Sequence, residues 1–198
     1  MLDDETRPHI IGFDPSLTGF GVSDGEQTYE ISTFQIDGED REIGLQRRCT
    51  EIVDRLDALY SEAPLHVYME APALRNMEHG GHLYEVGWLY SYIYNWVRHR
   101  EDVTYITQIS NGEILKAITG KGIATKTELA IKVWKKWEVE FEHDAKHNKL
   151  FAWCIWKLGT EHRAGRFEPK PAKSRGTGKR AQAKVQRRLR DSTPKALQ

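Results

Sequence analysis

The apolar residues of the N-terminal part follow first a strand pattern and then a helix pattern. A short apolar run at 10–13 ends in Asp14, and a second run follows after a proline-containing turn, which predicts a β-hairpin. Residues 29–36 (YEISTFQI) are rich in β-branched and aromatic side chains and predict a third strand. From 45 to 59, apolar residues recur every three or four positions among charged ones, which is typical of an amphipathic helix.

The rest of the chain alternates short strands with helices. The strand pattern at 65–70 (LHVYME) follows a helix, so a parallel crossover onto the first strand is expected. The same patterns predict a strand at 103–107 and helices at 82–97, 112–118, 127–137 and from about Asp144 through 158. This order predicts an α/β fold in which an antiparallel meander of three strands continues into parallel strands, with helices flanking the sheet.

One of these helices carries an aromatic stripe. Within 82–97, aromatic residues recur at every fourth position, at Tyr84, Trp88, Tyr92 and Trp96. Such spacing places them on one face of the helix, which favours a core contact or a subunit interface. A platform on which bases stack is the alternative.

Charge is distributed unevenly, although Lys+Arg and Asp+Glu number 29 each. Residues 163–198 hold 12 Lys and Arg against two acids, so residues 1–162 hold 17 basic and 27 acidic residues. The last segment has no apolar period and predicts a disordered basic tail. Such a tail commonly binds nucleic acid, or it is a solvated segment without a partner. We therefore expect a folded domain at 1–162 and a DNA-binding tail at 163–198.

Cysteine content and hydropathy exclude several classes of protein. Cys49 and Cys154 lie far apart in apolar helical stretches and are expected to be buried free thiols in a reducing compartment. No apolar run approaches the about 18 residues that span a membrane. The acidic, polar N-terminus lacks the apolar core of a signal peptide. A cytoplasmic location without membrane contact is expected.

Acidic residues in distant parts of the chain are the candidate chemistry. Parallel strands place their carboxyl ends at one edge of a sheet, so Asp14 and Glu70 are expected to lie together there. Asp144, at the predicted start of the last helix, is a third acid that the fold can bring to the same edge. Clustered carboxylates are stable when protonated or metal-bound, and oxygen ligands suit Mg²⁺ or Mn²⁺. The alternatives are a turn-capping Asp14 and a helix-capping Asp144.

Two histidines flank the third acid. His143 and His147 can each bind a metal ion or transfer a proton.

Two divalent ions about 4 Å apart can activate a water molecule and stabilise the leaving 3′-oxygen in phosphodiester cleavage.

Three segments, taken in order, resemble the RuvC-type Holliday junction resolvases of the RNase H-like superfamily. Residues 10–23 (IIGFDPSLTGFGVS) are similar to the family's first strand and hairpin, and 67–74 (VYMEAPAL) to its second acidic strand. Residues 116–126 (KAITGKGIATK) resemble its KxxxxGxGxAxK segment, which is the most specific match. The order and approximate spacing of these segments cover residues 8–160.

The resemblance implies an RNase H-like fold, a homodimer and metal-dependent paired nicking of four-way DNA junctions, with two Mg²⁺ or Mn²⁺ ions per site. By position, Asp14, Glu70 and Asp144 match catalytic, metal-binding carboxylates. The family's last acidic pair usually reads D-x-x-D or H-x-x-D, whereas this chain reads D-x-x-H. His147 therefore stands at the position of the fourth ligand, and Asn148 is a possible substitute oxygen ligand.

The resemblance also identifies candidate DNA contacts. Lys116 and Lys126 match basic residues near the DNA backbone and the active site, and a lysine near a cleaved phosphate stabilises developing charge. Lys126 is therefore a catalytic candidate, with an ordinary exposed helix lysine as the alternative. Lys121, in the Gly-Lys-Gly turn, is a candidate phosphate contact. The loop after the second acid carries in the family a residue that inserts at the junction centre, and here that region holds Leu74, Arg75 and Asn76.

The expected function is a metal-dependent, structure-specific endonuclease that resolves four-way junctions. By resemblance, a short domain with a basic tail is typical of a bacteriophage enzyme. One alternative is a broader nuclease that cuts forks and flaps. Another is a junction-binding protein that cuts poorly because His147 replaces an acid. A sugar or acetate kinase-like ATPase has the same general fold, but it needs glycine-rich phosphate loops and usually a second domain, and the sequence has neither.

Overall fold

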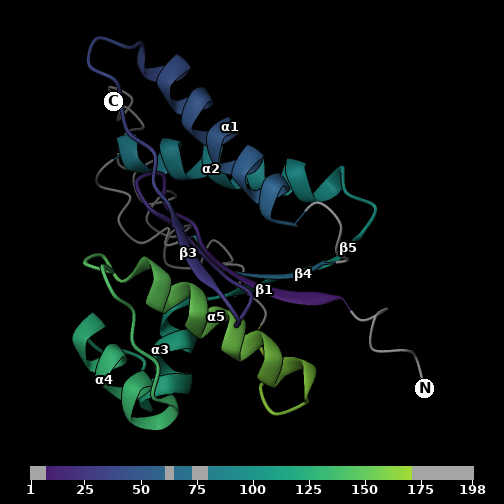
Figure 1. Cartoon of the computed structure of the whole chain (residues 1–198), viewed down its shortest axis with the longest axis vertical. Helices are drawn as coiled ribbons and strands as arrows, with labels where there is room; N and C mark the ends of the chain where they lie inside the picture. The colour runs from purple at the N-terminus through teal and green to yellow at the C-terminus, as the bar shows by residue number, and fades with distance from the viewer. Residues whose placement is uncertain (1–7, 61–64, 73–79, 171–198) are drawn as a thin grey trace, which may run out of the picture.

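The computed structural model describes residues 8–60, 65–72 and 80–170, which form a mixed β-sheet between two layers of helices (Figure 1). The strands are β1 (His9–Asp14), β2 (Phe20–Ser23), β3 (Thr28–Ile31), β4 (Leu65–Glu70) and β5 (Val103–Ile109). The helices are α1 (Arg41–Tyr60), α2 (Gly80–Arg98), α3 (Asn111–Thr119), α4 (Lys126–Trp137) and α5 (Asn148–Arg163). The sheet has five strands in the order β3-β2-β1-β4-β5.

The strand pairing confirms the predicted meander and crossover. β1 pairs antiparallel with β2, and β2 with β3, whereas β1 with β4 and β4 with β5 are parallel pairs. Phe13 in β1 is opposite Met69 in β4. The next residues, Asp14 and Glu70, therefore end two neighbouring parallel strands at the same edge of the sheet, as the sequence predicts.

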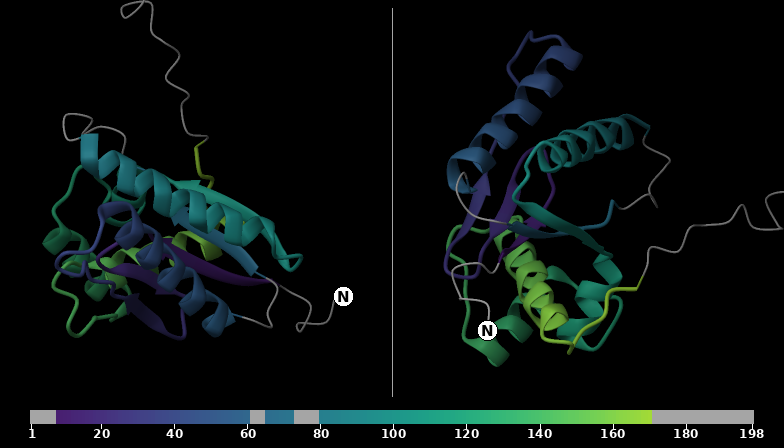
Figure 2. Two further views of the ribbon diagram at one scale, coloured as in Figure 1. Left: turned by 90° about the horizontal axis from the view of Figure 1, so that it is seen from above. Right: turned by 90° about the vertical axis from the view of Figure 1, so that its right-hand side faces the viewer.

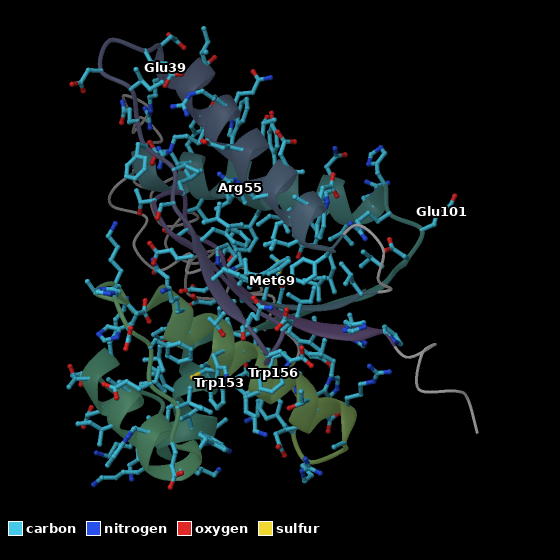
Figure 3. All side chains as sticks on the ribbon, in the orientation of Figure 1. Glu39, Arg55, Met69, Glu101, Trp153 and Trp156 are labelled. Atoms are coloured by element: carbon cyan, nitrogen blue, oxygen red, sulfur yellow. The ribbon has the colours of Figure 1, made fainter. Side chains whose placement is uncertain are left out.

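Different helices cover the two faces of the sheet. α1 and α2 lie together on one face, while α5 crosses the other face, with α3 and α4 on the same side (Figures 1 and 2). The apolar core is divided in the same way. Figure 3 labels Met69 on the side of α1 and α2, and Trp153 on the side of α5, and the two residues belong to separate apolar clusters.

Two glycines allow α5 to lie directly on the sheet. A Cβ atom on Gly12 of β1 would come 2.3 Å from the carbonyl oxygen of Ala152, and one on Gly21 of β2 would come 2.2 Å from the carbonyl oxygen of Asn148. Larger residues would force the helix backbone away from the strands. Because alternate residues of a strand share a face, Asp14 lies on the same face as Gly12. The first turn of α5 is therefore held close to Asp14.

The third strand ends at Ile31, earlier than the predicted range 29–36. Beyond it, Thr33 is buried, and its hydroxyl donates to the backbone oxygen of Leu17 and accepts from Nε of Arg48 at 3.0 Å. These contacts direct the chain off the strand ladder, which explains why a sequence rich in β-formers leaves the sheet.

The last helix begins at Asn148 and not near Asp144 as predicted. His143 and His147 both adopt left-handed backbone conformations, with φ of 56° and 61°, and this interrupts helical geometry before Asn148. At its other end, the helix extends beyond the predicted 158 to Arg163.

The residues after α5 contact the folded domain. Phe167 is half-buried against the apolar cluster on the α5 side, and the backbone N–H of Lys170 donates to Oε1 of Glu113 at 2.8 Å. Residues 171–198 of the predicted basic tail lie outside the described residues. The predicted disorder of the tail and the division between 1–162 and 163–198 therefore stay predictions.

The aromatic stripe of α2 contributes to the core along part of its length. Trp96 is buried, and its Nε1 donates to Oδ1 of Asp57 on α1 at 2.6 Å. Trp88 and Tyr92 are half-buried against the same cluster, whereas Tyr84 is exposed. The predicted core role is confirmed at Trp96, and the subunit interface stays a prediction.

Both cysteines are buried free thiols, as predicted. Burial raises the pKa of Cys49 to about 11, which keeps this thiol protonated and unreactive. In the described part of the chain, no helix combines the length and apolarity needed to cross a membrane.

Candidate active site

The carboxyl groups of Asp14 and Glu70 meet at the edge where β1 and β4 end. Burial raises the pKa of Asp14 well above its usual value, and the charge of Glu70 and a hydrogen bond to Glu70 raise it further. The charge of Lys126 lowers the pKa of Asp14, and that of Asp144 raises it. Three other sequence-predicted residues, Glu70, Lys126 and Asp144, therefore lie within electrostatic range of Asp14.

Two residues that the sequence did not predict hold Glu70 in place. Nδ2 of Asn111 donates to Oε1 of Glu70 at 2.9 Å, and the hydroxyl of Tyr90 donates to the backbone oxygen of Glu70 at 2.6 Å. Burial raises the pKa of Tyr90, and the charges of Glu70 and Asp14 raise it further, so the phenol stays protonated and remains a donor. Glu70 is thus fixed by its side chain and its backbone.

Asn111 occupies the first position of α3, where the backbone is well fixed. Ser110 and Glu113 form a reciprocal capping box at this helix end, each side chain bonding the backbone N–H of the other residue. The serine-to-glutamate spacing after a strand is the sequence signal that would have placed Asn111 at the carboxyl edge of the sheet. It does not indicate that the amide reaches Glu70.

Asp144 caps the first turn of α5 from outside the helix. Its Oδ1 accepts the N–H of Lys149 at 3.2 Å, and its Oδ2 accepts the N–H of Leu150 at 2.9 Å. The capping alternative from the sequence is therefore realised, although the start of the helix lies later than predicted. Capping does not exclude metal binding, because each carboxylate oxygen has a further lone pair.

The residues beside Asp144 are oriented differently. His147 is half-buried and lines a cavity together with residues of α4, while Nδ2 of Asn148 donates to Oε2 of Glu30 at 3.0 Å. His143 is exposed. Among the described residues, no three His, Cys, Asp or Glu side chains are grouped as a metal site. The four-ligand set with His147 therefore stays a prediction.

The residues at the sheet edge nevertheless fit a divalent cation. Asp14 is buried and Glu70 is half-buried, and burial together with the charge of Glu70 raises the pKa of Asp14; such a pair is stabilised either by a proton or by a cation between the two carboxyls. Their oxygens suit Mg²⁺ or Mn²⁺, and no cysteine ligand competes, because burial and the charge of Asp14 raise the pKa of nearby Cys154.

Lys126 reaches the site from the first position of α4, where Thr125 and Glu128 form a second capping box. Its Nζ donates to the backbone oxygen of Lys146 and lies 5.6 Å from the ring centroid of Phe151. These contacts hold the ammonium group near Asp14, whose pKa it lowers.

The other candidate DNA contacts are more exposed. Lys116 lies on the exposed side of α3, and Nζ of Lys121 lies 3.8 Å from Oε1 of Glu128 with 71% of its side chain exposed. Leu74, Arg75 and Asn76 lie outside the described residues.

Comparisons with known proteins bear on the fold. No protein-family model matches the chain, and no curated protein sequence matches it. A solved structure, Thermus thermophilus RuvC in complex with Holliday junction substrate, matches with a TM-score of 0.57 at 16% identity, covering 83% of this chain and 100% of that one. This chain has the RuvC fold. A second Thermus thermophilus RuvC structure matches with a TM-score of 0.56 at 18% identity, covering 81% of this chain and 99% of that one.

The RuvC fold confirms the predicted architecture. The apolar pattern predicted the mixed sheet with flanking helices, and three short segments predicted its RNase H-like class; the structural match covers more than four-fifths of the chain. At such low identity the likeness shows the fold and does not by itself establish which residues act. The candidate roles of Asp14, Glu70 and Lys126 therefore rest on their contacts in this chain.

Proposed function

We propose that this protein is a metal-dependent endonuclease that resolves four-way DNA junctions by paired phosphodiester cleavage. The observation that carries the proposal is the pairing of buried Asp14 with half-buried Glu70 at the carboxyl edge of a sheet with the RuvC fold. One solved structure with this fold is a RuvC in complex with a Holliday junction substrate. A junction is therefore the first substrate to test.

The roles of the site residues follow from their contacts. Asp14 and Glu70 would hold a divalent cation, with Asp144 as a further oxygen ligand, and the bound cation would supply Lewis-acid activation of water. Asn111 keeps the Glu70 carboxylate directed at the cation site, and Tyr90 holds the backbone of Glu70. Lys126 exchanges its contact with the Lys146 carbonyl for the cleaved phosphate and stabilises the charge that develops there.

The basic C-terminal segment would extend the DNA contact. The bond between Lys170 and Glu113 attaches Lys170, the residue that precedes 171–198, to the capping box beside Asn111. This segment holds nine Lys and Arg against one acid. It would bind phosphates without reading their sequence, together with Lys116 and Lys121.

A homodimer follows from the symmetry of the substrate. A four-way junction has two-fold symmetry, and two symmetric nicks need two active sites. The exposed Tyr84 and Tyr94 of α2 are our candidates for part of the interface.

A second candidate function is junction binding with weak cleavage. It is favoured by the orientation of His147 toward a cavity and by the capping bonds that occupy Asp144. A broader nuclease for forks and flaps is the remaining alternative.

One experiment separates these functions. Purified protein is incubated in single-turnover conditions with a mobile four-way junction, a fork, a flap and a duplex, in Mg²⁺ and in Mn²⁺. Our proposal predicts paired symmetric nicks in the junction that require a cation. Equal cutting of forks and flaps would favour the broader nuclease, and tight junction binding without nicks in either metal would favour the binding protein.

A further inference from the structure

A cavity of about 320 Å³ opens beside the candidate active site. One wall comes from α4, another from the segment that joins α4 to α5, and the third from the start of α5. Its lining residues are Ala130, Ile131, Trp134, Val139, Glu140, Phe141, Asp144, His147 and Leu150. Most of them are apolar, yet the cavity is open to solvent.

The cavity and the active site are joined along one helix face. Lys126, Ala130 and Trp134 are spaced four residues apart, so they follow one face of α4 from the site to the cavity. Eight helical residues span about 12 Å, at 1.5 Å each. With bases about 3.4 Å apart along a strand, this length equals three to four stacked nucleotides. Asp144 lines the cavity and is also within electrostatic range of Asp14.

The exposed residues of α4 differ from those of its packed face. Leu129 and Val133 are fully buried, whereas Ile131 and Trp134 are 47% and 54% exposed. An exposed indole beside an apolar floor gives a flat surface on which a base can stack. Exposed Lys132, Lys135 and Lys136 on the same helix supply positive charge for the neighbouring phosphates. Aromatic platforms flanked by basic side chains are the usual means of holding unpaired nucleotides.

The polar groups of the cavity select a base over a phosphate. The carboxylate of Glu140 would repel a phosphate, but it can accept a hydrogen bond from the exocyclic amino group of a base. The ring of His147 supplies a second polar edge. Cytosine and adenine carry such an amino group at the edge that thymine presents as a carbonyl.

We infer that the cavity binds one unstacked nucleobase of the DNA strand that is cut, three to four nucleotides from the cleaved phosphate. Trp134 stacks on the base, and the carboxylate of Glu140 accepts a hydrogen bond from its amino group. The inference rests on the proposed function, because it takes the bound strand to be the one held at Asp14 and Glu70.

The test uses junctions in which a single abasic site is placed at each of the first four positions on either side of the cut. For the wild-type protein, cleavage should fall at one position, by on the order of tenfold, the effect of losing one stacked base. Trp134→Ala should lower cleavage of the intact junction by a similar factor and abolish the difference between intact and abasic substrates. Trp134→Phe should restore most of that difference. Phe34→Ala, which removes an exposed aromatic side chain outside the cavity lining, is the matched control. It should change neither the cleavage of the intact junction nor the difference between intact and abasic substrates.

Base identity provides a second readout. At the sensitive position, replacing cytosine by thymine should slow the wild-type protein but not Glu140→Gln. A Trp134→Ala protein with the wild-type response to every abasic site would overturn the inference. Light scattering provides a further check. If the wild type is a dimer and Trp134→Ala is a monomer, the inference is also overturned, because the cavity would then be a contact between copies.

Fluorescence of 2-aminopurine at the sensitive position separates this inference from the nuclease proposal. If the wild-type protein does not cut, the probe is placed at each of the same positions in turn. Quenching that is lost in Trp134→Ala would support the base site even though the nuclease proposal had failed. Absence of Trp134-dependent quenching at every position would overturn the base site, whether or not the protein cuts.

Discussion

The two halves of the candidate site are built differently. Asp14 and Glu70 end neighbouring strands in register, and their positions are fixed by β1 and β4 and by the bonds of Asn111 and Tyr90 to Glu70. Asp144 and His147 lie in an irregular segment, where a left-handed residue precedes α5 and the oxygens of Asp144 already accept two N–H groups. The first half is preorganised for a cation. In the second half, Asp144 can bind a cation only in addition to the hydrogen bonds by which it already stabilises the fold.

This difference predicts that the strand-end pair carries the largest effect on chemistry. Asp14→Asn or Glu70→Gln should lower junction cleavage by about a thousandfold or more, because a cation contributes several kcal/mol to the transition state. Junction affinity should be nearly unchanged, since it comes mainly from phosphate contacts. Single-turnover cleavage and gel-shift binding measure the two effects. A variant that binds and still cuts at the wild-type rate would remove that carboxylate from the site.

The amide that positions Glu70 should have the next largest effect. Asn111→Ala should lower cleavage by about 10–100-fold, the usual range for residues that orient metal ligands. The concentration of Mg²⁺ that gives half-maximal cleavage should rise with it, because the Glu70 carboxylate loses its orientation. Asn95→Ala on the exposed part of α2 is a matched control. An unchanged Mg²⁺ dependence would show that the bond from Asn111 serves only the fold.

Restoring an acid at residue 147 tests whether the second half of the site binds metal. His147→Asp recreates a D-x-x-D pair and should lower the Mg²⁺ concentration required for cleavage, because a carboxylate adds negative charge that imidazole lacks. Cleavage at several Mg²⁺ and Mn²⁺ concentrations measures this change. A His147→Asp protein with unchanged metal dependence would place residue 147 outside the metal site.

The raised pKa of Asp14 predicts a pH effect on the cation-free protein. Because the folded state holds the proton more tightly than the unfolded state, Asp14 contributes stability at low pH that is lost as pH rises through its raised pKa. At neutral pH, Asp14→Asn should therefore raise the melting temperature in chelator by a few degrees. Thermal unfolding from acid to neutral pH, with and without Mg²⁺, tests this. Equal melting temperatures for both proteins across that range would show that neither burial of Asp14 nor repulsion by Glu70 destabilises the ionised carboxylate.

The basic tail should have the smallest effect on chemistry. Deleting 171–198 removes nine Lys and Arg while keeping the contact of Lys170 with Glu113. Affinity for all DNA shapes should fall and its salt dependence should become shallower, because fewer counterions are released. Preference for junctions over duplex should survive. An unchanged salt slope would contradict a phosphate-binding role, and a lost junction preference would assign shape recognition to the tail.

The sequence was informative where a periodic pattern determines the structure. Alternation and strand ends placed Asp14 and Glu70 at one edge. The position of Lys126 near them did not follow from a period, and was expected only from the resemblance of 116–126 to a family segment. The sequence was less informative where backbone conformation overrides pattern. The left-handed His147 delays α5, so Asp144 caps the helix from outside, and no sequence period signals this. The bond from Asn111 to Glu70 joins residues 41 positions apart and depends on tertiary packing.

The most direct test of the central claim is the amount of Mn²⁺ bound in the presence of junction DNA, measured by electron paramagnetic resonance for the wild type and Asp14→Asn. If Asp14 and Glu70 form the cation site, the wild-type protein binds Mn²⁺ that Asp14→Asn does not bind, while both proteins bind the junction equally. Equal Mn²⁺ binding by the two proteins would contradict the claim that this carboxylate pair is the metal centre.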